Sequence, residues 1–301
     1  MGLTQWWRRV TGKDKGSAKG DRTGKVGTST TRGARAKGGS KGAGAGARPK
    51  AAVDDHLKGL QQPTGKPGRR PALDRSRSVL GVDATRSGWL GALLDPTGHG
   101  TPHLLLAPSL QELLDQAGQV AVVAVTVPLG LPDQGRRDAD VQARRFLGEQ
   151  GSTVLTTPVR DAVYAISHSE ANAFNRAGGG SGVSSEAWEL RRRIQELDAW
   201  VRQDLPAVVV ETHPEAAFAT MAGAPLAARR RTGDGSAERR AVLATGGVYA
   251  PTTAPHGIGT DDVLDACAAA WSAHRVKNGE ASTFPKEPQQ HSDQIPAAIH
   301  V

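Results

Sequence analysis

The sequence predicts an α/β domain built on a mixed sheet and preceded by a long basic tail. Three observations lead to this prediction: short apolar runs, helical patterns between the later runs, and a sharp change of composition near residue 78. Short apolar runs are typical of buried strands, and strands that alternate with helices are typical of parallel sheets. We therefore expect residues 1–78 to form a disordered tail and residues 79–301 to form one folded domain.

The tail carries the positive charge of the chain. Residues 1–78 contain 19 lysine and arginine residues against 5 acidic residues, a net charge of +14, whereas residues 79–301 have a net charge of −6. The tail also contains 15 of the 37 glycines and few apolar residues, so it buries too little apolar surface to fold. Its charge predicts non-specific, salt-dependent binding to nucleic acid.

Two features bear on the compartment of the protein. No apolar run is long enough for a signal peptide or a membrane span, and the single Cys267 excludes an internal disulfide. Both features favour a cytoplasmic protein.

The domain begins with a predicted β-hairpin. Residues 79–82 form an apolar run that ends on Asp83, and residues 89–94 resume as the antiparallel partner after a polar, glycine-containing turn. A carboxylate at the end of a buried strand is costly unless it is paired or holds a metal ion. Asp83 is therefore a candidate metal ligand. The alternative is that it caps the turn through the local backbone.

The later elements are predicted from apolar periodicity and helix caps. Strands are expected at residues 103–107, 120–127 and 206–211, an edge strand at 294–301, and helices at 109–117, 135–148, 184–205, 236–244 and 261–277, with a short helix ending at Met221. The first three strands form an antiparallel meander, and the later strands run parallel to the first. The region from 135 to 205 is a helical insertion of the kind that forms the rim of a cleft, with loops at 151–160 and 178–182. Within it, Asp140 and Arg144 are expected to form a solvent-facing pair.

Acidic residues recur where the predicted strands end and where the last helix begins. Asp83 and Glu211 end two strands, while Asp262 and Asp265 lie three residues apart on one face of a helix. Side by side, they would meet at one edge of the sheet. Clustered carboxylates repel one another unless a divalent cation neutralises them, which predicts Mg²⁺ or Mn²⁺ at these four residues. For Asp262, favourable charge at a helix N-terminus is the alternative.

Six stretches resemble, in order and spacing, the motifs of a known family. They are VLGVDATRSGW, VPLGLPDQGRRDADVQARRFLG, GSTVLTTPVR, SSEAWELRRRIQELD, VVVETHPEAAF and GTDDVLDACAAAW. The family is the domain-of-unknown-function family numbered 429, regarded as predicted nucleases with an RNase H-like fold. The DxxDAxAxA pattern that starts at Asp262 also resembles the last helix of RuvC-type resolvases. The resemblance implies an RNase H-like mixed sheet and a candidate metal site between residue 79 and about residue 301.

One position departs from the pattern of that family. The strand before the LGLP turn usually ends in an acid two residues ahead of the proline, and here Thr126 stands at this position. A hydroxyl can orient a water but is a poor replacement for a carboxylate ligand. The departure predicts weakened catalysis.

Further residues are candidates for substrate contact. His213, in the E-x-H-P-E signature, is a candidate general base or phosphate contact, and a turn-stabilising imidazole is the alternative. Arginines could meet a phosphate chain, with solvated surface as the alternative for each. These arginines are Arg86, Arg136, Arg137, Arg229 and Arg230.

Three functions remain open at this point. The first is a Mg²⁺-dependent nuclease that hydrolyses phosphodiesters in nucleic acid. The second is a catalytically weakened relative that binds nucleic acid or a partner, which Thr126 and the acidic domain favour. The third is a phosphotransferase related to actin and the sugar kinases, because a glycine-containing turn after a strand-end acid can also hold ATP phosphates.

Overall fold

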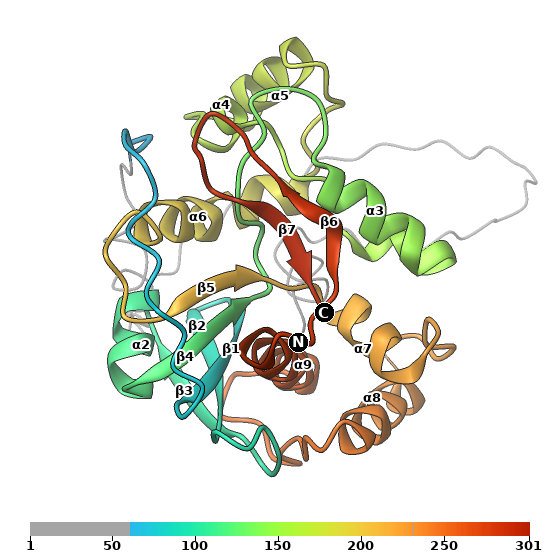
Figure 1. Cartoon of the computed structure of the whole chain (residues 1–301). Helices are drawn as coiled ribbons and strands as arrows, with labels where there is room; N and C mark the ends of the chain where they lie inside the picture. Colours follow the sequence, from blue (N-terminus) through green and yellow to red (C-terminus); the bar gives the residue numbers. More distant parts are fainter. Residues whose placement is uncertain (1–60, 231) are drawn as a thin grey trace, which may run out of the picture.

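The apolar runs of the sequence form a seven-stranded mixed sheet (Figure 1). The strands are β1 (Ser78–Thr85), β2 (Gly88–Leu94), β3 (His103–Ala107), β4 (Val120–Val125), β5 (Val208–Glu211), β6 (Thr283–Gln289) and β7 (Ala297–His300). Their order across the sheet is β3-β2-β1-β4-β5-β7-β6. Neighbours among β1, β4, β5 and β7 are parallel, while β2, β3 and β6 run antiparallel to their neighbours. The predicted α/β class, with a three-strand meander followed by parallel strands, is confirmed.

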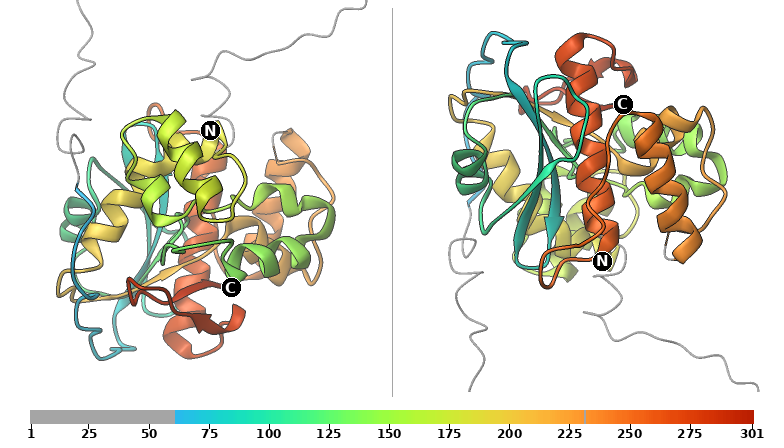
Figure 2. Two further views of the ribbon diagram at one scale, coloured as in Figure 1. Left: turned by 90° about the horizontal axis from the view of Figure 1, so that it is seen from above. Right: turned by 90° about the horizontal axis from the view of Figure 1, so that it is seen from below.

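Helices cover both faces of this sheet (Figure 2). On one face, α2 (Leu110–Ala117) and α6 (Ser185–Trp200) pack on apolar residues of β1 and β4. On the other face lies α9 (Thr260–Asn278), against which α7 (Pro214–Ala222) and α8 (Gly233–Thr245) pack. The remaining helices are α3 (Asp138–Leu147), η1 (Gly148–Thr153), α4 (Arg160–Val163) and α5 (His168–Ala177). None of the helices in the described part of the chain is long and apolar enough to cross a membrane.

The computed structural model describes residues 61–230 and 232–301. The predicted disorder of residues 1–60 lies outside the described residues. Residues 61–77, which the tail was expected to include, contact the chain just after α6: Gly68 N donates to Val201 O at 3.1 Å and Arg69 N donates to Asp204 Oδ1 at 2.8 Å. These contacts begin before residue 78. The division of the chain into a tail and a domain stays a prediction.

Several elements differ from those expected. Residues 160–163 and 168–177 form α4 and α5, and residues 283–289 form β6, none of which was predicted. Their apolar patterns are weak, since α5 buries only Ala171 and Asn175 and β6 contains two prolines. The strand near the C-terminus, β7, lies between β5 and β6, so its predicted place at the edge of the sheet is wrong.

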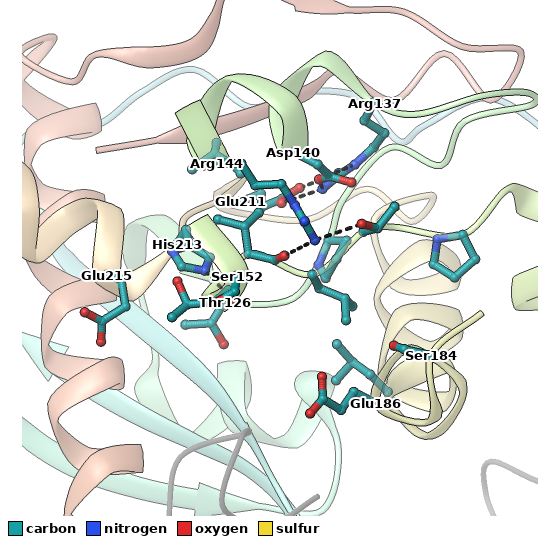
Figure 3. Close-up of a pocket in the computed structure, with 18 of the residues that line it drawn as sticks. Thr126, Arg137, Asp140, Arg144, Ser152, Ser184, Glu186, Glu211, His213 and Glu215 are labelled. Atoms are coloured by element: carbon teal, nitrogen blue, oxygen red, sulfur yellow. Dashed lines mark hydrogen bonds and ion pairs between the residues drawn. The ribbon is translucent and has the colours of Figure 1, made fainter. Parts of the chain in front are cut away.

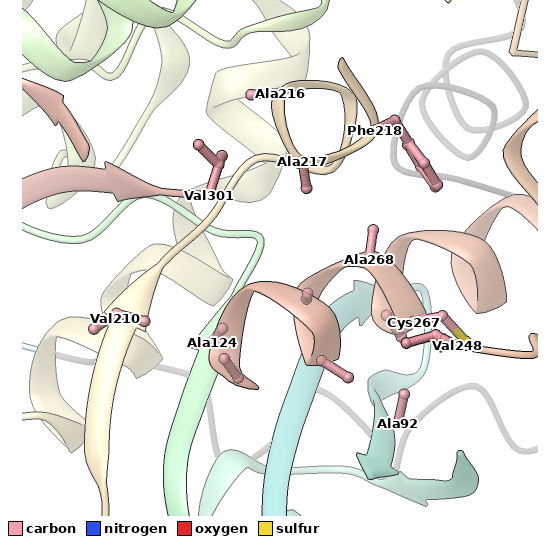
Figure 4. Packing of buried hydrophobic residues seen from close by; sticks show 14 of the residues in the cluster. Ala92, Ala124, Val210, Ala216, Ala217, Phe218, Val248, Cys267, Ala268 and Val301 are labelled. Carbon is pink, nitrogen blue, oxygen red and sulfur yellow. The ribbon is translucent and has the colours of Figure 1, made fainter. Parts of the chain in front are cut away.

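The last helix approaches the sheet unusually closely. Residues 266–270 of α9 are four alanines and Cys267, all fully buried (Figure 4). Opposite them on β1 lies Gly81, where an added Cβ would overlap backbone atoms of Ala266 and Ala270. Small residues on both sides therefore let the backbones of strand and helix touch. This contact sets the first turns of α9 beside the end of β1.

Candidate functional site

The alternation of side chains along the strands decides which acids meet. The register pairs Val125 of β4 with Glu211 of β5, so these two side chains share one face of the sheet. Asp83 and Thr126 lie on the opposite face, which α9 covers. Asp83 and Glu211 therefore lie at the same end of the sheet, on strands separated by β4, but on opposite faces.

Asp83 is fully buried and contacts Thr126. Thr126 Oγ1 donates to Asp83 Oδ1 at 2.5 Å, while Asp83 Oδ2 has no hydrogen-bond partner among the described residues. In the first turn of α9, Asp262 adds a second buried carboxyl group. Burial, together with the negative charge of Asp262, raises the pKa of Asp83 to about 7. A cation or a proton at this place would relieve the cost of two buried carboxylates.

Asp83, Asp262 and Asp265 form an acidic cluster. Arg230, from the segment between α7 and α8, contacts this cluster. The guanidinium of Arg230 forms an ion pair with Asp265 Oδ2, and its charge also lowers the pKa of Asp83, against the larger effect of burial. Gly259 N donates to Asp262 Oδ2 at 3.1 Å, so Asp262 also caps its helix. Arg230 is thus the counter-ion that the described residues supply to the cluster.

Glu211 is held by a buried arginine on the other face. Arg137 donates from Nη1 to Glu211 Oε2 at 2.7 Å and from Nη2 to Oε1 at 2.8 Å, and Leu129 N donates to Oε2 at 2.6 Å. Arg137 is 1 % exposed and also binds Asp140 Oδ1 at 2.5 Å. The carboxylate of Glu211 is therefore satisfied by the protein. Asp140 pairs with Arg137 inside the domain, so the predicted solvent-facing pair with Arg144 is wrong.

His213 forms the N-cap of α7. Ala216 N donates to His213 Nδ1 at 3.3 Å, and His213 Nε2 lies 3.3 Å from Thr153 O. Burial lowers the pKa of His213, so the neutral ring with Nε2–H pointing at the carbonyl satisfies both contacts. This arrangement agrees with the turn-stabilising alternative and leaves no free ring nitrogen to accept a proton.

Thr126 and Arg230, which contact Asp83 and Asp265 of the acidic cluster, line a cavity of about 290 Å³. Figure 3 shows this cavity. It lies where β4 and β5 end, the place at which open α/β sheets bind ligands. Thr126 and His213 line it from the sheet side, and Ser184 and Glu186 line it from the start of α6. The predicted helical insertion therefore forms much of its wall, through α3, residues 152–158 and α6.

The candidate arginines lie at different places. Arg86, Arg136 and Arg229 are exposed. Arg137 and Arg230 line the cavity, and both are ion-paired with carboxylates. The sequence therefore identified two arginines of the cavity and missed Arg144, which also lines it.

The comparisons with known proteins give one match. The sequence pattern of the family described as Protein of unknown function (DUF429) matches residues 81–290. The chain belongs to this family. The matched range of this DUF429 member contains the acidic cluster and most of the cavity wall. Neither the curated proteins nor the solved structures contain a match.

The residues of this DUF429 member fit one divalent cation but not the expected four-ligand site. Across residues 61–230 and 232–301, no group of three or more His, Cys, Asp and Glu side chains is arranged to hold a metal ion. Glu211 lies on the other face and Asp265 is paired with Arg230. Asp83, whose Oδ2 has no partner in the described part of the chain, still offers a carboxylate oxygen, and the carboxyl group of Asp262 lies nearby. Proteins commonly bind Mg²⁺ through one or two carboxylates together with waters and substrate phosphates.

The sequence also gave no prediction of a buried network around Arg160. Arg160 binds Asp198 Oδ2 at 3.0 Å and forms an ion pair with Asp293, and Tyr164 donates to Asp198 at 2.7 Å. The only signal was the position of Arg160 inside the GSTVLTTPVR motif, within a stretch that reads as a loop. Contacts between residues so distant in sequence follow from the tertiary fold alone.

Proposed function

We propose that the chain is a divalent-cation-dependent phosphodiesterase that acts slowly on nucleic acid and holds a single Mg²⁺ or Mn²⁺ ion. The observation that carries the proposal is the buried Oδ2 of Asp83, which has no partner among the described residues and lies near the carboxyl group of Asp262. The position at the carboxyl end of a central strand, beside a cavity, supports a role in ligand chemistry. The order of the sheet agrees with the fold that the family resemblance implies.

Each residue of the cluster has a distinct part in this proposal. Asp83 and Asp262 hold the cation, and Thr126 fixes the orientation of Asp83 through its hydrogen bond to Oδ1. Arg230 leaves the cluster or turns toward the phosphate when the cation adds positive charge beside Asp265. The bound cation would polarise a phosphate oxygen and lower the pKa of a water. Thr126 adds no charge, which favours one ion over two.

The test combines metal binding with cleavage. Calorimetric titration with Mn²⁺ is run on the unaltered chain, on Asp83→Asn and on Asp115→Asn, which changes an exposed aspartate on α2. Cleavage of labelled single-stranded, duplex and hybrid oligonucleotides is measured in parallel. We expect Mn²⁺ binding and slow cleavage by the unaltered chain and by Asp115→Asn, and neither by Asp83→Asn. Cleavage that persists in Asp83→Asn would refute the assignment of the site.

A second candidate function is binding of nucleic acid without hydrolysis. The ion pair between Arg230 and Asp265 and the hydroxyl of Thr126 favour it, because both reduce the negative charge available to a metal. On this alternative, the unaltered chain binds oligonucleotides but takes up no Mn²⁺ and cleaves nothing. The same titrations therefore separate the two candidates.

A further inference from the structure

One arginine of the cavity has no carboxylate partner within residues 61–230 and 232–301. Arg144, on α3, donates from Nη2 to Val154 O at 2.5 Å and to Thr156 Oγ1 at 2.8 Å, both neutral oxygens. Its Nε is buried and has no hydrogen-bond partner among the described residues. Arg137 and Arg230, the other arginines that line the cavity, are neutralised by Glu211 and Asp265. Arg144 is therefore the arginine of the cavity wall that lacks a carboxylate partner among the described residues, while the wall also carries the carboxylates of Asp140, Glu186, Glu211 and Glu215.

The surroundings of Arg144 suit a phosphate group. A guanidinium presents its donors in a planar fork that matches phosphate oxygens. Hydroxyl groups of Ser152, Thr156 and Ser184 line the same cavity and can donate to further phosphate oxygens. Figure 3 shows Arg144 and Ser184 on facing walls of this cavity.

The remaining lining and the size of the cavity limit the rest of the ligand. Val154, Leu155 and Leu190 supply apolar surface. A cavity of about 290 Å³ is at the small end of ligand sites, which commonly measure about 300–1,000 Å³. One small organic group with its phosphate fits such a space, whereas a duplex does not enter it.

We infer that Arg144 forms a phosphate subsite and that the cavity takes one phosphorylated nucleoside unit, free or at the end of a single strand. The inference deepens the proposed function, since it names the group that the site receives next to Asp83. The phosphate binds the guanidinium of Arg144, and the nucleoside lies against the apolar wall. Binding of this unit requires no divalent cation.

The first experiment uses the unaltered chain in EDTA, so that cleavage plays no part. Thymidine 5′-monophosphate, thymidine, inorganic phosphate, and a single-stranded tetranucleotide with and without a 5′-phosphate are titrated by calorimetry. We expect the monophosphate to bind about tenfold or more tightly than thymidine, as a charge-assisted contact predicts, and inorganic phosphate to compete with it. Tighter binding of the phosphorylated tetranucleotide would assign the subsite to a strand end, and equal binding would assign it to any phosphorylated nucleoside. Equal affinity for thymidine and its monophosphate would overturn the inference.

The second experiment changes the arginine. Arg144→Gln is compared with Arg145→Gln, which alters the exposed neighbour on the same helix. We expect Arg144→Gln to lose the preference for the monophosphate by about ten- to a hundred-fold, with thymidine unaffected, and Arg145→Gln to retain it. If Arg144→Gln unfolds at the same temperature as the unaltered chain and still prefers the monophosphate over thymidine, the subsite is refuted. If Arg144→Gln fails to fold, because Val154 and Thr156 lose their donor, the ligand series on the unaltered chain decides.

The two proposals fail in different ways. If the unaltered chain neither binds Mn²⁺ nor cleaves but prefers the monophosphate, the phosphodiesterase is refuted and the phosphate subsite is supported. If the unaltered chain cleaves with Mn²⁺ but binds thymidine and its monophosphate equally, the subsite is refuted and the phosphodiesterase is supported. Because the first series is run in EDTA, neither result depends on the other.

Discussion

Thr126 Oγ1 lies 2.5 Å from Asp83 Oδ1 and donates to it, so the hydroxyl occupies the place beside Asp83 at which the family pattern leads us to expect a carboxylate. Replacing it by an acid tests what this place contributes. We expect Thr126→Asp to tighten Mn²⁺ binding about tenfold and to raise cleavage, because affinity for hard cations rises with the charge of the ligands. Thr126→Val is the control, since it removes the hydrogen bond without adding charge. Unchanged Mn²⁺ affinity in Thr126→Asp, measured by calorimetry, would contradict the prediction.

The ion pair between Arg137 and Glu211 makes a prediction about stability. Glu211→Gln removes one of the two carboxylates that pair with the buried guanidinium of Arg137, Asp140 being the other, and breaking a buried pair costs up to about 3–5 kcal/mol of the free energy of unfolding. Glu280→Gln, which alters a distant and exposed partner of Arg275, should cost at most about 1 kcal/mol. Urea unfolding of both variants measures the difference. Equal midpoints for the two would refute a structural role for Glu211.

The close contact between β1 and α9 makes a second prediction about stability. Gly81→Ala forces a methyl group into the backbone of Ala266 and Ala270, and overpacking of this kind costs typically about 1–3 kcal/mol. Gly233→Ala is the matched control, because a Cβ there meets open space. We expect Gly81→Ala, but not Gly233→Ala, to melt at a lower temperature than the unaltered chain. An unchanged melting temperature of Gly81→Ala would show that α9 moves to accommodate the methyl group without loss of stability.

Burial of His300 predicts a dependence of stability on pH. Burial lowers the pKa of His300, whose Nδ1 lies 3.2 Å from Glu211 O, whereas in the unfolded chain the ring titrates near about 6.5. The unfolded state therefore binds the proton first, and the free energy of unfolding falls as the pH drops below that value. We expect His300→Gln to lose less stability than the unaltered chain between pH 8 and pH 5. Urea unfolding at several pH values measures the slope, and identical slopes would contradict this account.

The charge of the N-terminal segment predicts where non-specific affinity for nucleic acid lies. Residues 1–60 contain 14 lysine and arginine residues against 4 acidic residues, a net charge of +10, whereas the chain from residue 79 onward is acidic. Deleting residues 1–60 should weaken oligonucleotide binding and flatten its dependence on salt, because fewer counterions are released. Titrations at several salt concentrations measure the slope. An unchanged slope would assign the binding to the exposed arginines of the domain.

The sequence predicted the three-strand meander, the parallel strands that follow it and most of the helices, because their apolar patterns are strong. β4 is a run of six buried residues, and the expected helices at 109–117 and 184–205 begin after the N-caps Ser109 and Ser184. It also predicted the family to which the chain belongs, because the six quoted stretches occur in the order and spacing of the family motifs. The elements that escaped, α4, α5 and β6, carry few buried apolar residues and so give no periodic signal.

The composition of the acidic cluster was only partly predictable. Asp83 and Asp262 come together as expected, but Glu211 points to the other face, because it is in register with Val125 and not with Thr126. The strand alternation that decides this is visible in the sequence once the register is known. The register itself depends on tertiary packing. Glu211 and Asp265, which pair with Arg137 and Arg230, lie 74 and 35 residues away in the sequence, and no local pattern indicates such pairs.

The contact of Gly81 with α9 has a consequence for how this protein tolerates change. No side chain separates the two backbones, so the spacing between β1 and the first turns of α9 is set by direct contact of peptide groups, which substitutions outside this contact leave in place. Exchanges among the apolar residues elsewhere in the core can shift outer helices while this spacing stays constant. Substitutions in the surrounding layers therefore do not change the relative positions of Asp83 and Asp262. Random mutagenesis of the outer helices should yield many folded variants that keep the mutual placement of these two acids.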